Sequence, residues 1–505
     1  MKKGTSVKAE KENSLVRCSY LDEFNRNVPR MELIEKHLCS NFPNRYEENE
    51  KYYCIFHFPN ESKLSDFQIA LEEKKKRRHY FFSGTWFPDS VDFSWEDFNS
   101  LADFSHCVFN KNVKFNNSVF SVGVDFRCAN FKGKAEFSYV NFPNMQDVTE
   151  METSFYSTKF EDEANFFSTK FNNKIDFSES IFLGNASFSN ALFNADTSFK
   201  KAVFNSSFFT ETIFEKNVDF YESKILTAHF SKSIFRKVVD FRESCVETFL
   251  NFEGTSFESF AKFSGKDNKH SSWSKDALNF TSTDTEKPEK ISFRSIALKP
   301  DSFINTDTRK FEFTNIKWNV KSFAFDWSRF KDFKFWKDSA KERKAQYELL
   351  SIVYRRLATN AEENNRYQEA SNFRFTASEL DRIGSRWYGR ITPLSWLYKW
   401  SSRFGENWWW ALIILLFILA AFVVYYHFAY FQICPKSSEI KSECVVRTMS
   451  WIEAIHQSLM TAALQNVEFR KTILPEQDLV ILLQKILSPI QAALLALAIR
   501  RKFMR

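Results

Sequence analysis

Large apolar residues recur through the first half of the chain at steps that alternate between five and six residues. The regular series begins at Phe82 and ends at Phe263, and Phe fills almost every position in it. Residues with this spacing scatter around the circumference of an α-helix, so the pattern excludes a helical face. It suits a chain that turns a corner after each step and points one large residue inward on every side. We therefore predict a right-angled solenoid with coils of about 22 residues.

Most positions two residues before the ladder are small or β-branched, which supports the same geometry. They include Cys107, Ser118, Ala129, Ala135, Thr158, Thr169, Ala186, Ala191, Ala202, Val218 and Ala261. One large and one small inward residue per side would let coils stack about 4.8 Å apart and bury the Phe columns. Cys107 and Cys128 are expected in these small inward positions as buried free thiols. A step of 13 residues from Phe142 to Phe155 predicts a loop that bulges from one coil.

Of the 60 Phe residues, 31 lie on this ladder, which reads F-x-x-A-x-F-x-x-x-x-x-F. The pattern resembles the pentapeptide-repeat family in its Phe-centred variant. The resemblance covers residues 82–263 and implies a mainly β fold, a right-handed quadrilateral β-helix. Irregular repeats continue through later Phe residues, so we place the β-helix domain at residues 81–335. Those residues are Phe280, Phe293, Phe303, Phe311, Phe313, Phe323 and Phe325.

Residues 1–80 are expected to form an N-terminal cap that carries a candidate metal site. Cys18, Cys39, Cys54 and His57 supply four ligands of the kinds that close a tetrahedral zinc site. The C-x-x-H pair lies in a stretch, residues 53–71, that is similar to the opening of many pentapeptide-repeat membrane proteins. That resemblance implies structural zinc. The alternative is a small Phe- and Tyr-rich cap with incidental cysteines.

The same cap contains a basic run at the end of a predicted helix. The helix is expected from Leu64 to Arg78 and ends in KKKRR. A basic run of this kind can form a nucleic-acid or targeting patch. The favoured alternative is a helix C-terminus that its macrodipole stabilises and that caps the first coil of the solenoid.

A helical period replaces the β pattern from Lys337 to Ile383, within a third region at residues 336–405. Two apolar faces separated by the polar segment TNAEENN predict an antiparallel helical hairpin, with Gly384 as its C-cap. The next segment alternates Trp and Tyr with Arg and Lys, a mixture typical of a membrane interface. The alternative is an aromatic helix packed within the protein.

The last region, residues 406–505, contains two candidate transmembrane helices. Residues 408–428 lack formal charge, are long enough to cross a bilayer, and carry aromatic residues at both ends. Residues 479–499 are a weaker candidate because they include several polar residues. Basic residues precede the first span and follow the second, so the positive-inside rule places both termini in the cytoplasm. We expect a multi-pass protein of the bacterial inner membrane in contact with lipid.

Between the two spans, residues 451–464 are mostly apolar but too short to cross a bilayer, so we expect a re-entrant helix. Span, short helix and span together resemble two-helix tetrameric cation channels, and WIEAIHQSLMTAA resembles their pore helix. The segment TAALQNV stands where a TVGYG-like filter would lie, so a K⁺ filter is not supported. The resemblance implies a homo-oligomer, with a tetramer favoured, that passes ions.

Polar residues in these segments are the candidate pore-lining residues. Gln484, Ser488 and Gln491 share one face of the second span, which must meet a partner or water. They could line a pore between subunits or form hydrogen bonds between helices of a structural bundle. On the short helix, Glu453, His456 and Thr461 are candidates for a vestibule. For the Glu/His pair the alternative is simple solvation.

Two cysteines, Cys434 and Cys444, lie in the loop between the spans. With both termini in the cytoplasm, this loop would lie outside, where an oxidising compartment permits a disulfide. The pair would close a short loop, and free thiols are the alternative.

The net charge of +7 conceals an asymmetry, because residues 81–263 carry 17 Lys and Arg against 25 Asp and Glu. We favour a channel-like oligomer whose cytoplasmic solenoid senses a signal or protein partner and gates a membrane pore. A narrower version is a bacterial defence or stress effector that permeabilises the membrane. A membrane-tethered binding scaffold is the alternative, and a DNA-mimicking topoisomerase modulator is less favoured.

Nothing in the sequence indicates an enzyme. The chain lacks phosphate-cradling glycine loops, H-E-x-x-H and G-x-S-x-G, and no nucleophile–base pair stands out. We expect no cofactor other than zinc and no nucleic-acid partner.

Overall fold

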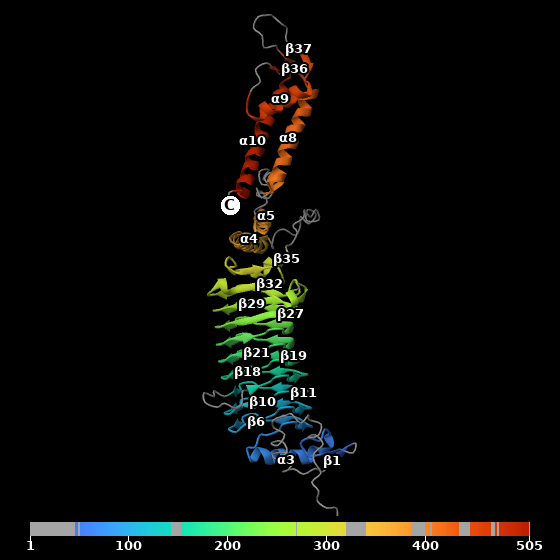
Figure 1. Ribbon diagram of the computed structural model, residues 1–505, viewed down its shortest axis with the longest axis vertical. Helices are drawn as coiled ribbons and strands as arrows, with labels where there is room; N and C mark the ends of the chain where they lie inside the picture. Colours follow the sequence, from blue (N-terminus) through green and yellow to red (C-terminus); the bar gives the residue numbers. More distant parts are fainter. Residues whose placement is uncertain are drawn as a thin grey trace, which may run out of the picture. The chain divides into compact units, whose positions relative to one another are not determined.

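The computed structural model describes residues 46–48, 51–142, 153–268, 270–319, 340–384, 399–403, 407–433, 445–465, 470–471 and 474–503. The chain divides into two compact units, Met1–Lys321 and Ser322–Arg505. The first unit holds a mainly β solenoid of about 10 turns, coloured from blue to yellow-green in Figure 1. The predicted fold class is confirmed in this respect.

Short parallel strands form the four sides of each coil, so that the backbone of one coil pairs with the backbones of its neighbours. Three sides belong to one 22-stranded sheet, and the fourth is a 9-stranded sheet. The larger sheet contains β3 (Trp86–Phe87), β4 (Val91–Asp92), β6 (Ala102–Asp103), β7 (Val108–Phe109), β8 (Val113–Lys114), β10 (Val124–Asp125), β11 (Asn130–Phe131), β12 (Ala135–Glu136), β14 (Thr153–Ser154), β15 (Lys159–Phe160), β16 (Ala164–Asn165), β18 (Ile175–Asp176), β19 (Ile181–Ser187), β21 (Thr197–Ser198), β22 (Val203–Phe208), β24 (Val218–Asp219), β25 (Lys224–His229), β27 (Val239–Asn251), β29 (Ala261–Gly265), β30 (Leu278–Asn279), β32 (Ile291–Arg294) and β34 (Glu312–Thr314). The smaller sheet contains β5 (Asp97–Phe98), β9 (Val119–Phe120), β13 (Asn141–Phe142), β17 (Lys170–Phe171), β20 (Leu192–Phe193), β23 (Ile213–Phe214), β26 (Ile234–Phe235), β28 (Ser256–Phe257) and β31 (Asp284–Thr285). A further parallel pair, β33 (Ala297–Leu298) and β35 (Lys317–Trp318), lies in the last described coils.

The Phe ladder forms stacked columns in a dry interior. Phe109, Phe131 and Phe160 pair in register from coil to coil, and their rings stack 4.7 and 4.8 Å apart, each within 3° of parallel. Every ladder Phe from 82 to 263 is at most 1% exposed. Burial of aromatic area on this scale is the main stabilising contribution available to such a rod. The predicted Phe core is therefore confirmed.

One coil is longer than its neighbours. Phe131 pairs with Phe160, 29 positions later, whereas Phe109 pairs with Phe131, 22 positions later. The coil therefore contains seven extra residues, and the ladder resumes in register after them. The bulging loop predicted between Phe142 and Phe155 falls mainly on residues 143–152, which lie outside the described residues.

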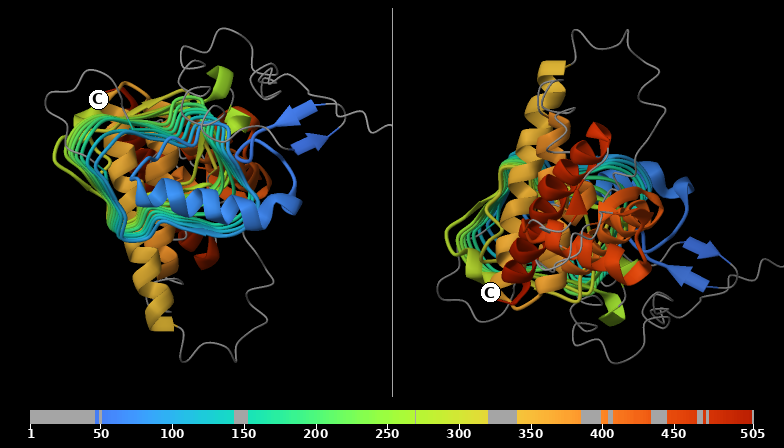
Figure 2. Two further views of the ribbon diagram at one scale, coloured as in Figure 1. Left: turned by 90° about the horizontal axis from the view of Figure 1, so that it is seen from below. Right: turned by 90° about the horizontal axis from the view of Figure 1, so that it is seen from above.

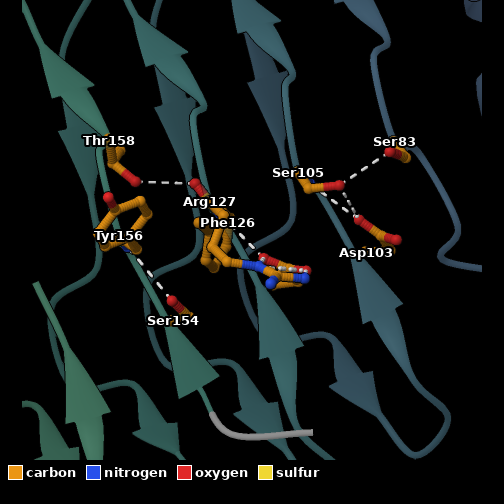
Figure 3. A network of polar contacts seen from close by, with 9 residues as sticks. Ser83, Asp103, Ser105, Phe126, Arg127, Ser154, Tyr156 and Thr158 are labelled. Atoms are coloured by element: carbon orange, nitrogen blue, oxygen red, sulfur yellow. Dashed lines mark hydrogen bonds and ion pairs between the residues drawn. The ribbon is translucent and has the colours of Figure 1, made fainter. Parts of the chain in front are cut away.

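Polar side chains satisfy the backbone at the corners. On one side of the rod an Asp directly before the ladder Phe accepts a hydrogen bond from the N–H directly after it, as Asp103 does from Ser105 at 2.9 Å. Small inward residues bond to carbonyls, as when the Thr158 hydroxyl donates to the Phe126 carbonyl at 2.8 Å (Figure 3). Such bonds remove the cost of unpaired polar atoms at each turn.

The residue two after the ladder Phe occupies a left-handed turn at two of the four corners. Trp95, His106, Asn117, Cys128 and Tyr139 all have φ between 57° and 64° there, and Gly84 and Gly254 occupy two equivalent positions. This turn corrects one expectation: Cys128 is exposed at a corner, because it follows Phe126 by two instead of preceding a ladder residue by two. Cys107 is buried as predicted, and burial raises the pKa of its thiol.

The cap precedes the first coil. It comprises the hairpin β1 (Tyr46–Glu48) and β2 (Lys51–Tyr53), the 3₁₀ turn η2 (Glu61–Lys63) and helix α3 (Leu64–Lys76). Figure 2 shows α3 lying across the end of the solenoid. Two lysines of α3 donate to carbonyls of the first coil, Lys74 to Phe81 at 2.7 Å and Lys75 to Asp92 at 2.8 Å. These contacts agree with the interpretation of the basic run as a helix end that caps the first coil.

In the second unit, α4 (Ala340–Glu363) and α5 (Tyr367–Gly384) form a helical hairpin. Tyr354 and Leu357 of α4 are buried, as are Phe373 and Leu380 of α5. The C-terminal helices follow: α8 (Trp408–Phe428), α9 (Trp451–Ala462) and α10 (Pro475–Phe503). A small antiparallel sheet, β37 (Val445–Thr448), β36 (Tyr430–Ile433) and β38 (Arg470–Lys471), lies between them in sequence.

Candidate functional site

The candidate site of the C-terminal helices is a buried polar centre where α8, α9 and α10 meet. The Gln484 side chain on α10 is fully buried and accepts a hydrogen bond from the Tyr426 hydroxyl on α8 at 2.7 Å. Its amide donates to the Ser458 hydroxyl and carbonyl on α9, at 2.8 and 3.0 Å. One side chain therefore ties all three helices together through hydrogen bonds that satisfy both ends of its amide.

The other two polar residues on this face of α10 are buried as well. Gln491 donates to the Ala411 carbonyl of α8 at 2.8 Å and to the Ser401 carbonyl at 3.1 Å. The Ser488 hydroxyl is buried and has no hydrogen-bond partner among the residues that the structure describes. The bonds of the two glutamines correspond to the alternative in which this face links helices within one chain.

On α9 the predicted vestibule residues have three different environments. Glu453 forms an ion pair with Arg447 at 2.7 Å and completes a capping box with Ser450. His456 is exposed. Thr461 is buried and accepts a hydrogen bond from Gln457 at 3.3 Å. The Glu453 carboxylate thus stabilises the start of its own helix.

The outward surfaces of these helices are apolar. Two helices, Trp408–Phe428 and Pro475–Arg500, are long and apolar enough to cross a membrane, with only 11% and 17% of their most apolar stretches buried. Side chains exposed on them include Phe417, Leu416, Ile413, Leu479, Leu482 and Ile486. A helix in the core of a soluble protein would bury these residues, so the exposed surface indicates association with a membrane.

A small pocket lies near the start of α8. Phe375, Lys399, Trp400, Arg403 and Trp410 line about 240 Å³, and the Arg403 guanidinium lies 4.7 Å from the centre of the Phe375 ring. The Trp410 indole donates to the Trp400 carbonyl at 2.7 Å. Trp and cationic side chains gather here, as the sequence predicts for a membrane interface.

The candidate zinc site is described only in part. Cys54 and His57 are both buried, and the Cys54 Sγ lies 3.1 Å from His57 Nδ1. His57 Nε2 lies 3.2 Å from the Ser83 carbonyl, so an N–H there would orient the ring as a metal ligand requires. Ligand bond lengths of zinc would place such a sulfur and nitrogen roughly 3.5 Å apart, close to this distance. Cys18 and Cys39 lie outside the described residues.

The disulfide candidates also lie outside the described residues, but the strands that flank them are described. Cys434 follows β36 directly and Cys444 precedes β37 directly, and these strands pair antiparallel at Ile433 and Val445. The pairing holds the two ends of the intervening loop together. The disulfide stays a prediction.

The sequence pattern did not reveal two residues of the polar centre. Tyr426 was assigned to an aromatic belt, and Ser458 was assigned only to a short apolar helix. Both share hydrogen bonds with Gln484, from 58 and 26 positions away. A polar residue within each apolar segment was the available signal, because buried polar groups require partners.

Comparison with known proteins bears on the solenoid. The family model for pentapeptide repeats (9 copies) matches residues 155–203 and 177–224. No curated protein and no solved structure has significant similarity to the chain. The matched coils contain the same Phe columns and paired strands as the coils before and after them.

Proposed function

We propose that the chain is an oligomeric, channel-like protein of the bacterial inner membrane whose cytoplasmic solenoid receives a signal or protein partner and gates the membrane part. Pentapeptide repeats joined to two apolar helices support this proposal. The observation that carries it is the short helix α9, held between α8 and α10 by Gln484 and too short to span a bilayer. A defence or stress effector that permeabilises the membrane is the narrower form of the proposal.

Ion flux tests this function directly. The full chain would be purified in detergent, its subunit number measured by native mass spectrometry, and its flux recorded in vesicles. We expect a closed symmetric oligomer, with a tetramer favoured, and a measurable ion flux. A monomer that passes no ions, with or without candidate signals, contradicts the proposal.

Exposed residues make better pore tests than the buried glutamines, because substitution of Gln484 would also destabilise the helix bundle. His456→Ala should change the conductance or selectivity of the pore if α9 lines a vestibule. Leu497→Ala, at an exposed apolar position of α10, is the matched control and should leave both unchanged.

A membrane-tethered scaffold is the second candidate function. The hydrogen bonds of Gln484 and Gln491 within one chain favour it, since they use both ends of the Gln484 amide and the amide nitrogen of Gln491. On this proposal the solenoid binds a partner and the helices serve only as an anchor. Partner binding without any flux would separate the two functions.

We also propose that the cap holds a structural zinc ion through Cys54, His57, Cys18 and Cys39. Lys63 and Lys74 both interact electrostatically with Cys54. We expect one zinc per chain by elemental analysis and loss of most of it in Cys54→Ser. Cys128→Ser, which removes an exposed cysteine at a corner, should retain the metal. Absence of metal from the wild-type chain contradicts this site.

A further inference from the structure

A polar cleft of about 430 Å³ opens on one side of the solenoid, where β27, β29, β32 and β34 lie in successive coils. It is lined by side chains that flank the ladder Phe residues on this side. Lys262, Ser264, Ser292 and Arg294 form its middle. None of these four residues belongs to the membrane helices or to the candidate zinc site.

The pattern of the repeats shows what differs at Arg294. On this side of the rod, two other Arg residues directly follow a ladder Phe, and each pairs with the Asp that directly precedes that Phe. Arg127 pairs with Asp125 at 2.5 Å, and Arg242 pairs with Asp240 at 2.6 Å. At Arg294 the preceding position is Ser292, so the usual internal acceptor is missing.

Lys262 departs from the pattern in the same place. The equivalent position in the two preceding coils is Asp219 and then Asp240, which pair in register with each other and with Lys262. Lysine therefore reverses the charge that the repeat normally carries there. Within the described part of the chain, neither Lys262 nor Arg294 has a carboxylate within ion-pair distance.

The strand register brings these groups together. Lys262 pairs with Ser292, and Ser264 pairs with Arg294, so the two cations lie on adjacent coils with hydroxyls beside them. The Ser264 hydroxyl accepts a hydrogen bond from the Glu243 N–H at 3.0 Å, which leaves its own proton to donate.

The two acids of the lining already have hydrogen-bond donors. Glu243 accepts from the Asp267 N–H at 2.7 Å, and Glu312 accepts from the Thr314 hydroxyl at 3.4 Å. Among the described residues, neither acid forms an ion pair with Lys262 or Arg294, so both cations are left for a ligand.

We propose that this cleft binds the oxyanionic group, phosphate or carboxylate, of a small polar metabolite. The Arg294 guanidinium matches the two oxygens of such a group, Lys262 adds a second charge, and the serine hydroxyls donate to it. The cleft volume exceeds that of a lone anion, and Tyr221 and Glu312 at its walls face the polar remainder of the molecule. Binding does not depend on the proposed membrane function; only the role of this ligand as a gating signal rests on it.

Calorimetric titration of the full chain in detergent tests the site, with inorganic pyrophosphate and citrate as probes at constant ionic strength. The key variants restore the normal repeat. Ser292→Asp recreates the Asp-Phe-Arg arrangement of residues 240–242, so the new carboxylate should neutralise Arg294. Lys262→Asp recreates the Asp-Phe-Ser arrangement of residues 176–178. Arg309→Gln is the matched control, because Arg309 pairs with Asp307 and lies outside the cleft.

We expect at least one probe to bind the wild-type chain, and both restoring variants to weaken binding by about tenfold or more, since each loses a charge-assisted contact. Arg309→Gln should bind as the wild type does. Preference for pyrophosphate or for citrate distinguishes a phosphate from a carboxylate ligand. The proposal is overturned if neither probe binds at millimolar concentration, or if Arg309→Gln loses as much affinity as the restoring variants. Because each variant restores a repeat sequence that already folds, two independent tests of the same site are available.

Discussion

The solenoid and the C-terminal helices place polar and apolar side chains in opposite ways. In the solenoid the interior is a dry stack of Phe rings, and charged groups lie mainly at corners and on outward faces. In the helix bundle Gln484 and Gln491 are buried, while Phe417 and Leu479 are exposed. Water favours the first arrangement, and a lipid bilayer, where backbone and side-chain polar groups require internal partners, favours the second. The comparison teaches that the solenoid and the C-terminal helices suit different solvents.

The largest effect on stability is expected when one ring is removed from a Phe column. Phe166 stacks between Phe137 and Phe188, each 4.8 Å away, so Phe166→Ala would leave a cavity that the rigid coils cannot close. We expect a loss of about 3–5 kcal/mol in the free energy of unfolding. Denaturant titration of the full chain, followed by the β signal in circular dichroism, measures it. Trp95→Ala, at a corner residue that is 78% exposed, is the control and should cost less than about 1 kcal/mol.

The N-terminal cap differs from the solenoid that follows it, because the cap buries the side chains of two lysines. Burial lowers the pKa of Lys63 and of Lys74 from 10.5 to about 7. The unfolded chain then binds more protons than the folded chain between pH 7 and 10.5, so stability should rise with pH across that window. Below pH 7 both states are protonated, and this contribution should be constant.

Unfolding free energies measured at pH 7 and pH 9 at fixed zinc concentration would show this rise, which we expect to amount to a few kcal/mol. Lys74→Met should reduce the slope by about half, since it removes one of the two titrating groups. Lys76→Met, at an exposed position of α3, serves as the control. An equal slope in Lys74→Met and the wild type would contradict the assignment.

A smaller effect is expected in the polar centre of the C-terminal helix bundle. Gln484→Leu removes both hydrogen-bonding ends of the amide and leaves the hydroxyls of Tyr426 and Ser458 without that partner. We expect a loss of about 1–3 kcal/mol in the stability of the helical unit in detergent. Titration with a denaturing detergent, followed by helical circular dichroism, measures it.

Ser488→Ala is expected to have the smallest effect on stability, and it is the control for Gln484→Leu. The Ser488 hydroxyl is buried without a described partner, so its removal should be neutral or slightly stabilising. A loss as large as that of Gln484→Leu would mean that this hydroxyl meets a group from another subunit or a water-filled pore. That result would move the polar face of α10 from the bundle interior to the pore.

The Phe ladder could be predicted because its steps of five and six residues form a short local period. The place of a residue in that period is enough to predict that its side chain points inward. The placement of Cys128 at an inward position was wrong, although the period itself puts Cys128 two residues after Phe126, at the left-handed corner, and puts Ala129 two residues before Phe131. The seven extra residues of one coil follow from the step of 13 residues between Phe142 and Phe155, where the alternation calls for a step of six. The pairing of Phe131 with Phe160 confirms that number.

The helix bundle could be predicted only in part. The positions of α8 and α9 follow from apolar length, yet the partners of Gln484 depend on how distant helices meet, which no local period encodes. The cleft beside Arg294 could not be predicted for the same reason, because it depends on how coils that are distant in sequence meet. The sequence Ser-Phe-Arg at residues 292–294 is unusual only in comparison with Asp-Phe-Arg at residues 240–242. The strand register is needed to show that these two sequences occupy equivalent positions in the coils.

The lysines at the first coil have a consequence for how molecules of this protein meet. The carbonyls of Phe81 and Asp92 point away from the second coil, and the equivalent carbonyls of Asp103 and Lys114 accept N–H groups from the preceding coil. Lys74 and Lys75 therefore take the place of a missing coil. A bare end would offer a ready template for another rod, since a parallel stack has no natural limit. By capping these carbonyls, the two lysine side chains block end-to-end stacking of one solenoid on another, which would otherwise produce a filament.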